Sequence, residues 1–573
     1  MPYLIHLLCL TGLFSVAIIL QEKNPFEDGT YTQFTLSIIE DGDFNLINQT
    51  KDPGRNWLAT KTGNHPNYEH PAIAIYLFPF IGYQKLLSQD QSFAQAHILA
   101  TIFFLMLGLI LLKKVLDYLD FQHSKEAIAV LAFSTPFLWF SLMASTTSNI
   151  FSLVYSIIIL AAFCFNRDKS TTGLYFFLGV ATTLGFAIRI QQFWIVSLFL
   201  YLFSIDKNRS YHKVLSYIAG ALIPLSLLLC NLYLRSGSFL HPHHVYTSWT
   251  RLGEFWNSTL YYALFGPNGY FVLSPIYFII LIQGLILLYK KYEHKKLYIA
   301  LIIPPTVLFL YYSVQWPLMD SLAGRHQLDY FFVYSLIIAS ALDWSQKNRK
   351  IYYSLWFLIS LAIIWNLRTH LAYFYIDNTK GAEWQFSYFV SPQYLAEQFW
   401  GAMNLIKPLS HLVSVLKFLP LIFLLAAGTF FFSRLSYRNY LKFCYYFILW
   451  GVSFYFLFTQ LNIYNNPHNV STYRREGIYQ SKVITSGNFA TFYDDFIETH
   501  HKGLRWHLMQ KDCATIQRLI EIKEEFIKAV KQEIIYDPIG FVDMLNAGKL
   551  RRSYLEEQNL DEIYATLEEV CPF

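Results

Sequence analysis

The chain has 573 residues, of which 54% are hydrophobic, 18% are aromatic and only 14% are charged. Its apolar residues come in blocks of about bilayer-spanning length, which indicates a polytopic membrane protein rather than a soluble one. The net charge of +5 does not indicate nucleic acid binding, because the basic residues are spread through short loops instead of forming one stripe.

The apolar blocks predict an all-α transmembrane bundle, because lipid forces each spanning segment to satisfy its own backbone polar groups. The first block lacks the positively charged start and small-residue cleavage site of a secretory signal, so it is expected to remain as a span. About 13 spans are predicted in all. Their expected ranges are 3–20, 93–112, 126–143, 147–165, 172–188, 190–205, 214–234, 270–289, 297–316, 328–344, 351–367, 411–432 and 441–460.

The distribution of Lys and Arg predicts how these spans are oriented. With a cytoplasmic amino terminus, most basic residues fall in the predicted cytoplasmic loops, as the positive-inside rule requires. The short apolar segment 71–87, which contains Pro79, would invert every later loop if it crossed the membrane. We therefore expect an interfacial or re-entrant helix there, and a similar element within 258–275. The chain is therefore predicted to be a multi-pass integral membrane protein.

Residues 1–460 are thus the expected transmembrane domain, with a first extracytoplasmic loop at 21–92. An odd number of spans places the tail, 461–573, outside the cytoplasm. Its stretch "CATIQRLIEIKEEFIKAVKQEI" has apolar residues at helical spacing, which predicts a small, mostly helical soluble domain. Cys513 and Cys571 in this tail form either a disulfide or two separate thiols.

The first loop opens with acidic residues beside the first span. Glu27 or Asp28 is expected to cap a helix that begins at Gly29, and a capping role alone would explain such acids. The alternative is a functional role for one of them. Asp41 and Asp43 have the spacing of the DxD motif of metal-dependent sugar transferases, but a turn that ends this helix is the favoured interpretation.

Histidines and one glutamate follow later in this loop. His65, Glu69 and His70 are candidates for positioning a substrate through its hydroxyl or phosphate groups, and an ordinary polar loop is the alternative. Their spacing is not favoured as a metal site, and "FLHPHHVYTSW" is an equally weak metal signal. No metal ligand is assigned, although the sequence leaves a divalent cation open.

Two arginines are candidates for binding phosphate at the membrane surface. Arg325, followed by His326, leads directly into a span, and a guanidinium binds phosphate oxygens bidentately without losing its charge. Interfacial anchoring by snorkelling is the alternative for Arg325. Arg189 lies between two spans in "AIRIQQFW", in a linker too short to be merely a solvated loop. The polar extracytoplasmic regions are expected to converge on one cavity.

The order of these elements resembles the GT-C superfamily of integral membrane glycosyltransferases. The first loop, with "EDGTYTQFTLSIIEDGDFNL" and "AIAIYLFPFIGY", is similar to theirs, and "FFLGVATTLGFAIRIQQFW" and "SLAGRHQLDYFFVYSLIIAS" resemble later segments of the protein mannosyltransferase and aminoarabinose transferase branch. The resemblance covers about residues 1–345. It implies sugar transfer from a polyprenyl-phosphate (or dolichyl-phosphate) donor to an acceptor on the outer face of the membrane, usually with inversion, with Asp28 as the base or acceptor-orienting group. Because the members that it resembles are bacterial, it also implies a bacterial inner (plasma) membrane. Relatives often carry an Asp-Glu pair where this chain has Glu27, Asp28 and Gly29, which leaves open which acid faces the acceptor.

Other classes of membrane protein remain alternatives. A transporter or flippase of lipid-linked or polar solutes would place ionisable residues near the bilayer midplane and often contains inverted repeats, whereas the central spans here are nearly free of charge. A polysaccharide ligase or polymerase would have its largest outside loop late in the chain. A structural membrane protein with a partner-binding tail is a third alternative.

Overall fold

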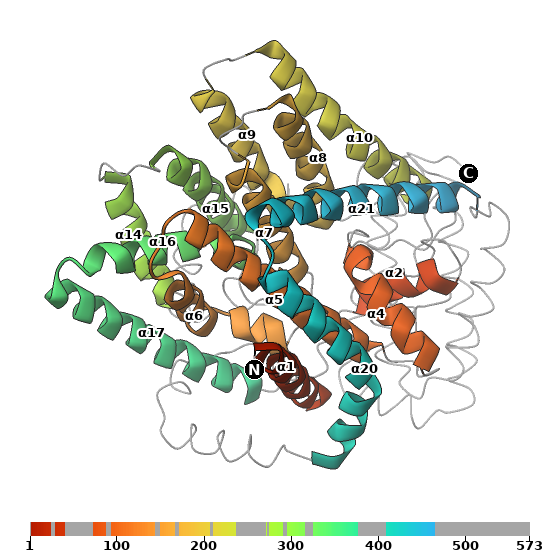
Figure 1. Ribbon diagram of the computed structural model, residues 1–573, viewed down its shortest axis with the longest axis horizontal. Coiled ribbons are helices and arrows are strands. Elements are labelled where there is room, and N and C mark those ends of the chain that lie inside the picture. Colours follow the sequence, from red (N-terminus) through yellow and green to blue (C-terminus); the bar gives the residue numbers. More distant parts are fainter. Residues whose placement is uncertain are drawn as a thin grey trace, which may run out of the picture. The chain divides into compact units, whose positions relative to one another are not determined.

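The computed structural model describes residues 2–23, 29–40, 73–87, 93–143, 149–166, 171–206, 210–236, 271, 274–289, 295–315, 325–375 and 408–464. In these ranges the regular structure is entirely helical, as the sequence predicts (Figure 1). The elements are α1 (Pro2–Lys23), α2 (Gly29–Glu40), α4 (Ala74–Leu87), α5 (Ala94–Tyr118), α6 (Ser124–Ser134), η2 (Trp139–Met143), α7 (Asn149–Cys164), α8 (Thr172–Ile188), η4 (Ile190–Phe193), α9 (Trp194–Ile205), α10 (Tyr211–Ser236), α14 (Ile276–Tyr289), α15 (Lys295–Gln315), η5 (Arg325–Tyr330), α16 (Phe331–Ser345), α17 (Arg349–Tyr375), α20 (Pro408–Ser433) and α21 (Tyr437–Tyr464).

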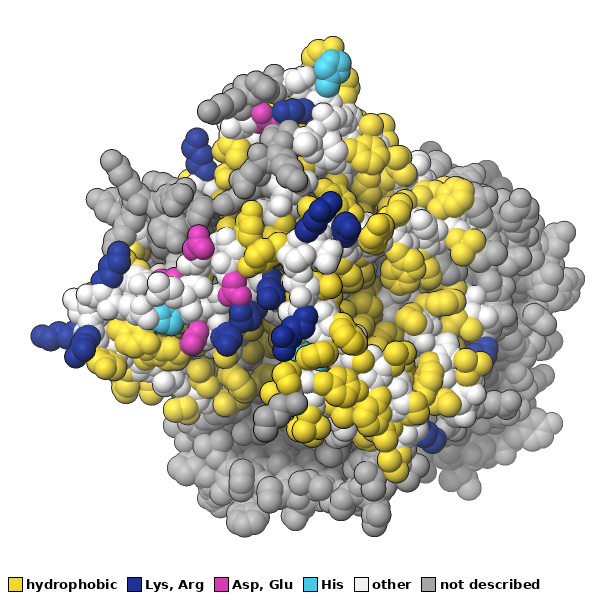
Figure 2. Space-filling view, viewed as in Figure 1, with side chains coloured by type: hydrophobic (Ala, Val, Ile, Leu, Met, Phe, Trp, Pro, Cys, Tyr) yellow, Lys and Arg dark blue, Asp and Glu magenta, His cyan; other side chains and the backbone are white. Residues whose placement is uncertain are grey.

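The described helices make the chain a multi-pass integral membrane protein. Five are long and apolar enough to cross a bilayer, in the ranges Ala94–Tyr118, Tyr211–Asn231, Arg349–Leu367, Val415–Ser433 and Tyr437–Leu457. These helices expose large apolar side chains such as Leu424, which is 69% exposed, and Phe431, which is 67% exposed. Figure 2 shows broad hydrophobic areas on the visible face, interrupted by Lys and Arg side chains. Such an apolar surface is suited to contact with the hydrocarbon core of a bilayer.

The chain divides into two compact units. The first consists of 1–35, 70–226 and 250–456, and the second of 36–69, 227–249 and 457–573. In the second unit the structure describes only the ends of α2, α10 and α21. The predicted tail domain, 461–573, therefore lies outside the described residues except for the last turn of α21.

The core of the first unit is built around α7. All of its residues, Asn149–Cys164, are buried, and it packs extensively against α5 and η5. A helix that is apolar all round is expected to be enclosed by others, and this one is. Polar residues interrupt its apolar sequence at Asn149, Ser152 and Ser156, which recur at the spacing of one helix face.

Helices α8 and α10 approach each other at two glycines. A Cβ on Gly179 would lie 2.0 Å from the carbonyl oxygen of Tyr217, and one on Gly220 would lie 2.2 Å from that of Phe176. The two backbones are therefore in direct contact. Small residues allow this close approach in membrane bundles, where packing replaces the hydrophobic effect as the driving force.

The predicted continuous span 126–143 is wrong. Helix α6 ends at Ser134, Thr135 is extended with φ −124° and ψ 170°, and the chain resumes as the π-helix η2 at Trp139. The physical reason is Pro136, because a residue before proline is driven out of the helical region. The Asn366 side-chain amide donates to the carbonyls of Phe133 and Thr135, both at 3.0 Å, which satisfies acceptors at this break.

Helix α4 is a largely buried helix of 14 residues that runs back along the first half of α5. Gln84, near its end, accepts a hydrogen bond from the Ala96 backbone N–H at 3.0 Å, in the first turn of α5. Tyr76, near its start, packs on Phe104 in the middle of α5, with ring centroids 5.0 Å apart. At a rise of about 1.5 Å per residue, α4 is about 21 Å long, too short to cross a bilayer.

The helices of the first unit place their polar residues at two ends. At the first, here called the Arg189 end, α5, α7, α9 and α16 begin and α8 ends; η4 and η5 contact each other there. At the other, the His123 end, α6 and α17 begin and α16 ends. The rings of Tyr118, Phe165 and Tyr437 pack edge-on or tilted against one another there, where α5 and α7 end and α21 begins. The alternation predicted from the sequence places all of the Arg189 end on one side of the membrane.

Candidate functional site

The structure describes only some of the residues that the sequence singles out. Glu27, Asp28, His65, Glu69 and His70 lie outside the described residues, as do both acids of the DxD-like pair. Arg325 and His326 are placed as the first two residues of η5, a 3-10 helix. Arg189 is described in full, so the candidate site is built around it.

Arg189 lies between α8 and η4 in extended backbone, with φ −162° and ψ 146°. Its side chain is directed inward, and the residue is only 9% exposed. The guanidinium Nη1 lies 3.3 Å from Oδ2 of Asp329 and also donates a short hydrogen bond to Oδ1 of Asn149. Asp329 is 0% exposed. A buried arginine is thus paired with a buried carboxylate, as ionisable groups inside a membrane protein must be.

A neighbouring glutamine fixes η4 against α7. The Gln192 amide donates to the carbonyl of Ser152 at 3.0 Å and to its hydroxyl at 2.7 Å, while its oxygen accepts from Ser156 and from the indole N–H of Trp194. Gly185 permits this contact, because a Cβ there would lie 2.8 Å from Cβ of Gln192. The backbone that carries Arg189 is therefore rigidly held, a requirement for a preorganised binding group.

Asp329 was not identified from the sequence as a site residue. It lies in the same 3-10 helix as Arg325 and His326, and this helix packs on α7. The sequence did indicate an acidic residue at the start of a predicted span. An ionisable side chain inside a membrane protein is expected to be paired with another polar or charged group. The identity of that partner could not be predicted, because Arg189 and Asp329 are distant in the chain and meet only through the packing of η4, η5 and α7.

A second polar contact at the Arg189 end joins the first-loop helix α2 to the bundle. The Thr32 hydroxyl lies 3.2 Å from Nδ1 of His97, in the first turn of α5. His97 is 0% exposed, and its ring lies beside that of Phe151, with centroids 5.7 Å apart. Asn149, two residues before Phe151 on α7, is the partner of Arg189. A run of contacts through α7 therefore connects α2 with the Arg189–Asp329 pair.

Some buried polar atoms at this end have no hydrogen-bond partner among the described residues. They include Nε2 of His97, the hydroxyl of Tyr76 and Oε1 of Gln33. Buried polar groups are nearly always paired, and an unpaired one is accounted for by strain, by a functional role or by a bound water or ion. The unpaired atoms of His97 and Gln33, next to the contact between α2 and α5, mark this end of the bundle as the candidate site, whereas Tyr76 lies nearer the middle of α5.

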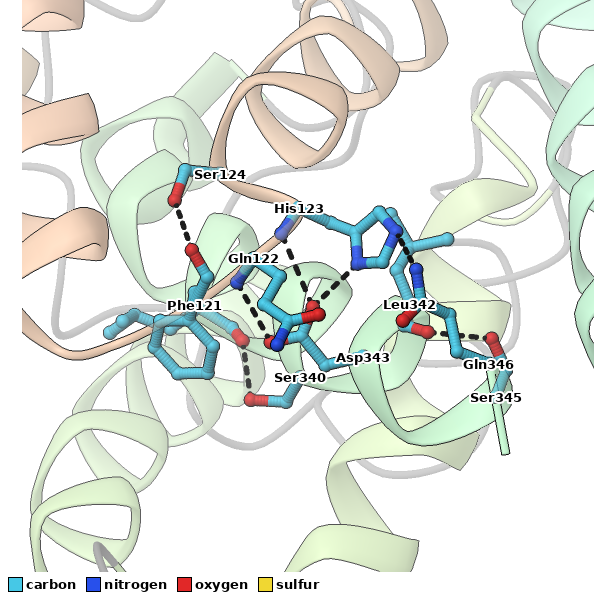
Figure 3. Close-up of polar contacts among 10 residues, drawn as sticks. Phe121, Gln122, His123, Ser124, Ser340, Leu342, Asp343, Ser345 and Gln346 are labelled. Atoms are coloured by element: carbon cyan, nitrogen blue, oxygen red, sulfur yellow. Dashed lines mark hydrogen bonds and ion pairs between the residues drawn. The ribbon is translucent and has the colours of Figure 1, made fainter.

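The His123 end contains an aspartate–histidine pair of a different character (Figure 3). Nδ1 of His123 lies 2.5 Å from Oδ1 of Asp343, and the backbone N–H groups of Gln122 and His123 donate to the same carboxylate. Nε2 of His123 is 2.6 Å from the side-chain amide nitrogen of Gln346. Both ring nitrogens are thus engaged, and none is left to take a proton from a nucleophile. The cluster joins the start of α6 to the end of α16.

The described part of the site offers no metal-binding group. Within the ranges that the structure describes, no group of three or more His, Cys, Asp and Glu side chains could hold a metal ion. Comparisons with protein families, curated proteins and solved structures found no match to this chain. Its function is therefore inferred from the chain's own residues.

Proposed function

We propose that the protein is a GT-C type glycosyltransferase that transfers a sugar from a polyprenyl-phosphate donor to a lipid, glycan or protein acceptor at the Arg189 end. The observation that carries the proposal is the contact between Thr32 and His97. It joins α2, which begins one residue after Asp28, to the end of the bundle that holds Arg189, Asp329 and the first residue of η5, Arg325. The helix that directly follows the candidate carboxylate and the elements that contain the two candidate phosphate-binding arginines thus lie at one end.

The proposed chemistry needs one group of each charge. The acceptor hydroxyl attacks the anomeric carbon while Asp28, or Glu27 in its place, accepts the hydroxyl proton. The bond between the anomeric carbon and the phosphate oxygen breaks, and the polyprenyl phosphate leaves with the electron pair. The configuration at the anomeric carbon is inverted. Arg325 stabilises the phosphate charge, and Arg189, whose Nη1 is already paired with Asp329 and Asn149, is the second candidate for this role. The oxocarbenium-like transition state favours a nearby carboxylate.

The proposed arrangement has about 13 spans, with the Arg189 end outside the cytoplasm and α4 as a re-entrant half-helix. The buried packing of α4 along the first half of α5 favours the re-entrant alternative over an interfacial helix. Irregular or broken membrane segments are tolerated only where protein encloses them or where they line a cavity. His65, Glu69, His70 and His326 are proposed to position the sugar or the phosphate.

The decisive test compares cells that carry the wild-type protein, Asp28→Asn, Glu27→Gln or no protein. Loss of a general base slows transfer by about a hundredfold or more, so the polyprenyl-phosphate sugar accumulates in Asp28→Asn cells as it does without the protein. Protein quantity and insertion are checked by immunoblot of washed membranes. Normal donor levels in correctly inserted Asp28→Asn and Glu27→Gln would rule out the catalytic role of both acids, and EDTA treatment of membranes would reveal a need for a divalent cation.

A transporter or flippase is the second candidate, because a buried ion pair such as Arg189–Asp329 is also typical of a transport path. The two functions differ in where the donor accumulates when the protein is lost. A missing transferase leaves the sugar on the outer leaflet, where periodate added to spheroplasts oxidises it. A missing flippase leaves it on the inner leaflet, protected until the membrane is permeabilised.

A further inference from the structure

We propose that His97 is a positioning residue, a role that rests on the proposed function. Through Thr32 it fixes the first turn of α2 on the bundle, and this helix directly follows the proposed catalytic acids. His97 lies within the apolar helix α5 and has no place in the chemistry proposed above. Its contact with α2 gives it a role in positioning that helix.

The imidazole of His97 is held from several sides. Its backbone N–H donates to the carbonyl of Phe93 at 3.2 Å, and the preceding residue, Ala96, is bonded to Gln84 of α4. The ring is fully buried, with the Phe151 ring at 5.7 Å and an interplanar angle of 37°. An enclosed ring of this kind has few alternative rotamers, so Nδ1 is a fixed point on the bundle.

Thr32 is the fourth residue of α2, one helical turn from the start of the helix. Its hydroxyl can donate to Nδ1 or accept from it, depending on the imidazole tautomer. In either case, removal of the hydroxyl leaves a second ring nitrogen of His97, in addition to Nε2, without a partner among the residues that the structure describes. Because a buried unpaired nitrogen is costly, α2 would have to shift or admit water.

The contact also sets the distance between α2 and the Arg189 cluster. His97 touches Phe151, and Asn149, on the preceding half-turn of α7, bonds to Arg189. Helix α2, which follows Asp28, and Arg189, which is proposed to bind phosphate, are therefore both held by contacts that lead to the same helix, α7. A catalytic pair needs such shared support, because a misplacement of about 1 Å can cost about a hundredfold in rate.

The test uses purified protein in nanodiscs, with the six cysteines replaced by serine and Asp28→Cys as a reporter. The rate at which a polar maleimide labels the reporter measures how firmly the start of α2 is held. Thr32→Val removes the hydroxyl at nearly constant shape and is expected to raise this rate by about threefold to tenfold, the effect of one lost hydrogen bond. Thr32→Ser, the matched control, keeps the hydroxyl and should leave the rate unchanged.

His97→Phe should raise the rate as Thr32→Val does, and the double variant should raise it no further, because both remove one and the same contact. Equal rates in Thr32→Val and Thr32→Ser, or fully additive increases, would overturn the proposal. Should His97→Phe fail to fold, the two Thr32 variants decide the question alone.

Donor accumulation separates this inference from the proposed function. With Asp28 intact, Thr32→Val should cause the polyprenyl-phosphate sugar to accumulate at unchanged protein quantity, and Thr32→Ser should not. If labelling responds to Thr32→Val while neither Thr32→Val nor Asp28→Asn alters donor levels, the positioning of α2 stands and the transferase function falls. If Asp28→Asn causes accumulation and the Thr32→Val reporter labels at the control rate, the positioning role falls instead.

Discussion

Arg189 and Asp329 form a buried ion pair, with Nη1 and Oδ2 separated by 3.3 Å and the carboxylate fully enclosed. Removal of one member leaves the other as an uncompensated buried charge, so Asp329→Leu and Arg189→Met should each destabilise the protein by about 3–5 kcal/mol. The double variant should be less damaging than the sum, because it leaves no charge behind. Thermal unfolding in detergent, followed by size-exclusion chromatography, measures all three. Additive losses would mean that the two side chains act independently.

The close approach of α8 and α10 predicts strong sensitivity at their glycines. Gly179→Ala places a methyl group against the backbone of Tyr217, so the helices must separate and the melting temperature should fall clearly. Gly428→Ala in α20 is the matched control, because a Cβ there meets nothing within 4 Å. It should be neutral or slightly stabilising, since alanine favours the helix. Similar melting temperatures for the two variants would contradict the backbone contact.

Asn366 holds the break between α6 and η2. Its amide donates to two carbonyls, of Phe133 and Thr135, and its oxygen accepts from Ser274. Asn366→Leu leaves these groups unpaired, at a cost of about 1–3 kcal/mol for each buried group. Asn366→Asp retains the acceptor for Ser274 but loses both donors and should be at least as damaging. Detergent stability of the three proteins tests this order.

The paired cluster at the His123 end should behave as a structural contact. Asp343→Asn weakens the bonds from His123 and from two backbone N–H groups, and we expect a loss of about 1–3 kcal/mol in stability. The proposed sugar transfer, measured per folded molecule, should be unaffected, because this cluster lies at the end opposite to Arg189. Donor levels in cells, normalised to membrane-inserted protein, provide the measurement. Donor accumulation at normal protein quantity would move the functional site to this end.

The helices could be predicted from the sequence because length and hydropathy alone decide them in lipid. Each expected span coincides with a described helix or with a broken pair such as α6 and η2, but only five of the described helices are long and apolar enough to cross a bilayer, so the count of 13 spans stays a prediction. That break was visible as Thr135–Pro136, but the apolar run around it favoured one helix. Arg189 was identifiable as a polar residue in a linker that is too short to be solvated.

Its partners were not predictable, because they come from other parts of the chain. Asp329 and Asn149 reach Arg189 only when η5 and α7 pack together, and no local pattern specifies that packing. His97 was passed over because a single histidine in an apolar helix does not reveal that a threonine of the first loop will face it. The roles of Glu27 and Asp28 remain predictions, since both lie outside the described residues.

The half-length of α4 has a consequence for biogenesis. A segment of 14 residues is too short to be released into the bilayer as an independent span, so it cannot be inserted on its own. Its aromatic side chains Tyr76 and Phe78 pack on Phe447 and Phe454 of α21, a helix that is synthesised hundreds of residues later. Final docking of α4 must therefore wait for the arrival of α21. Docking of α4 against α21 is therefore a late step that follows membrane insertion of the helices between them.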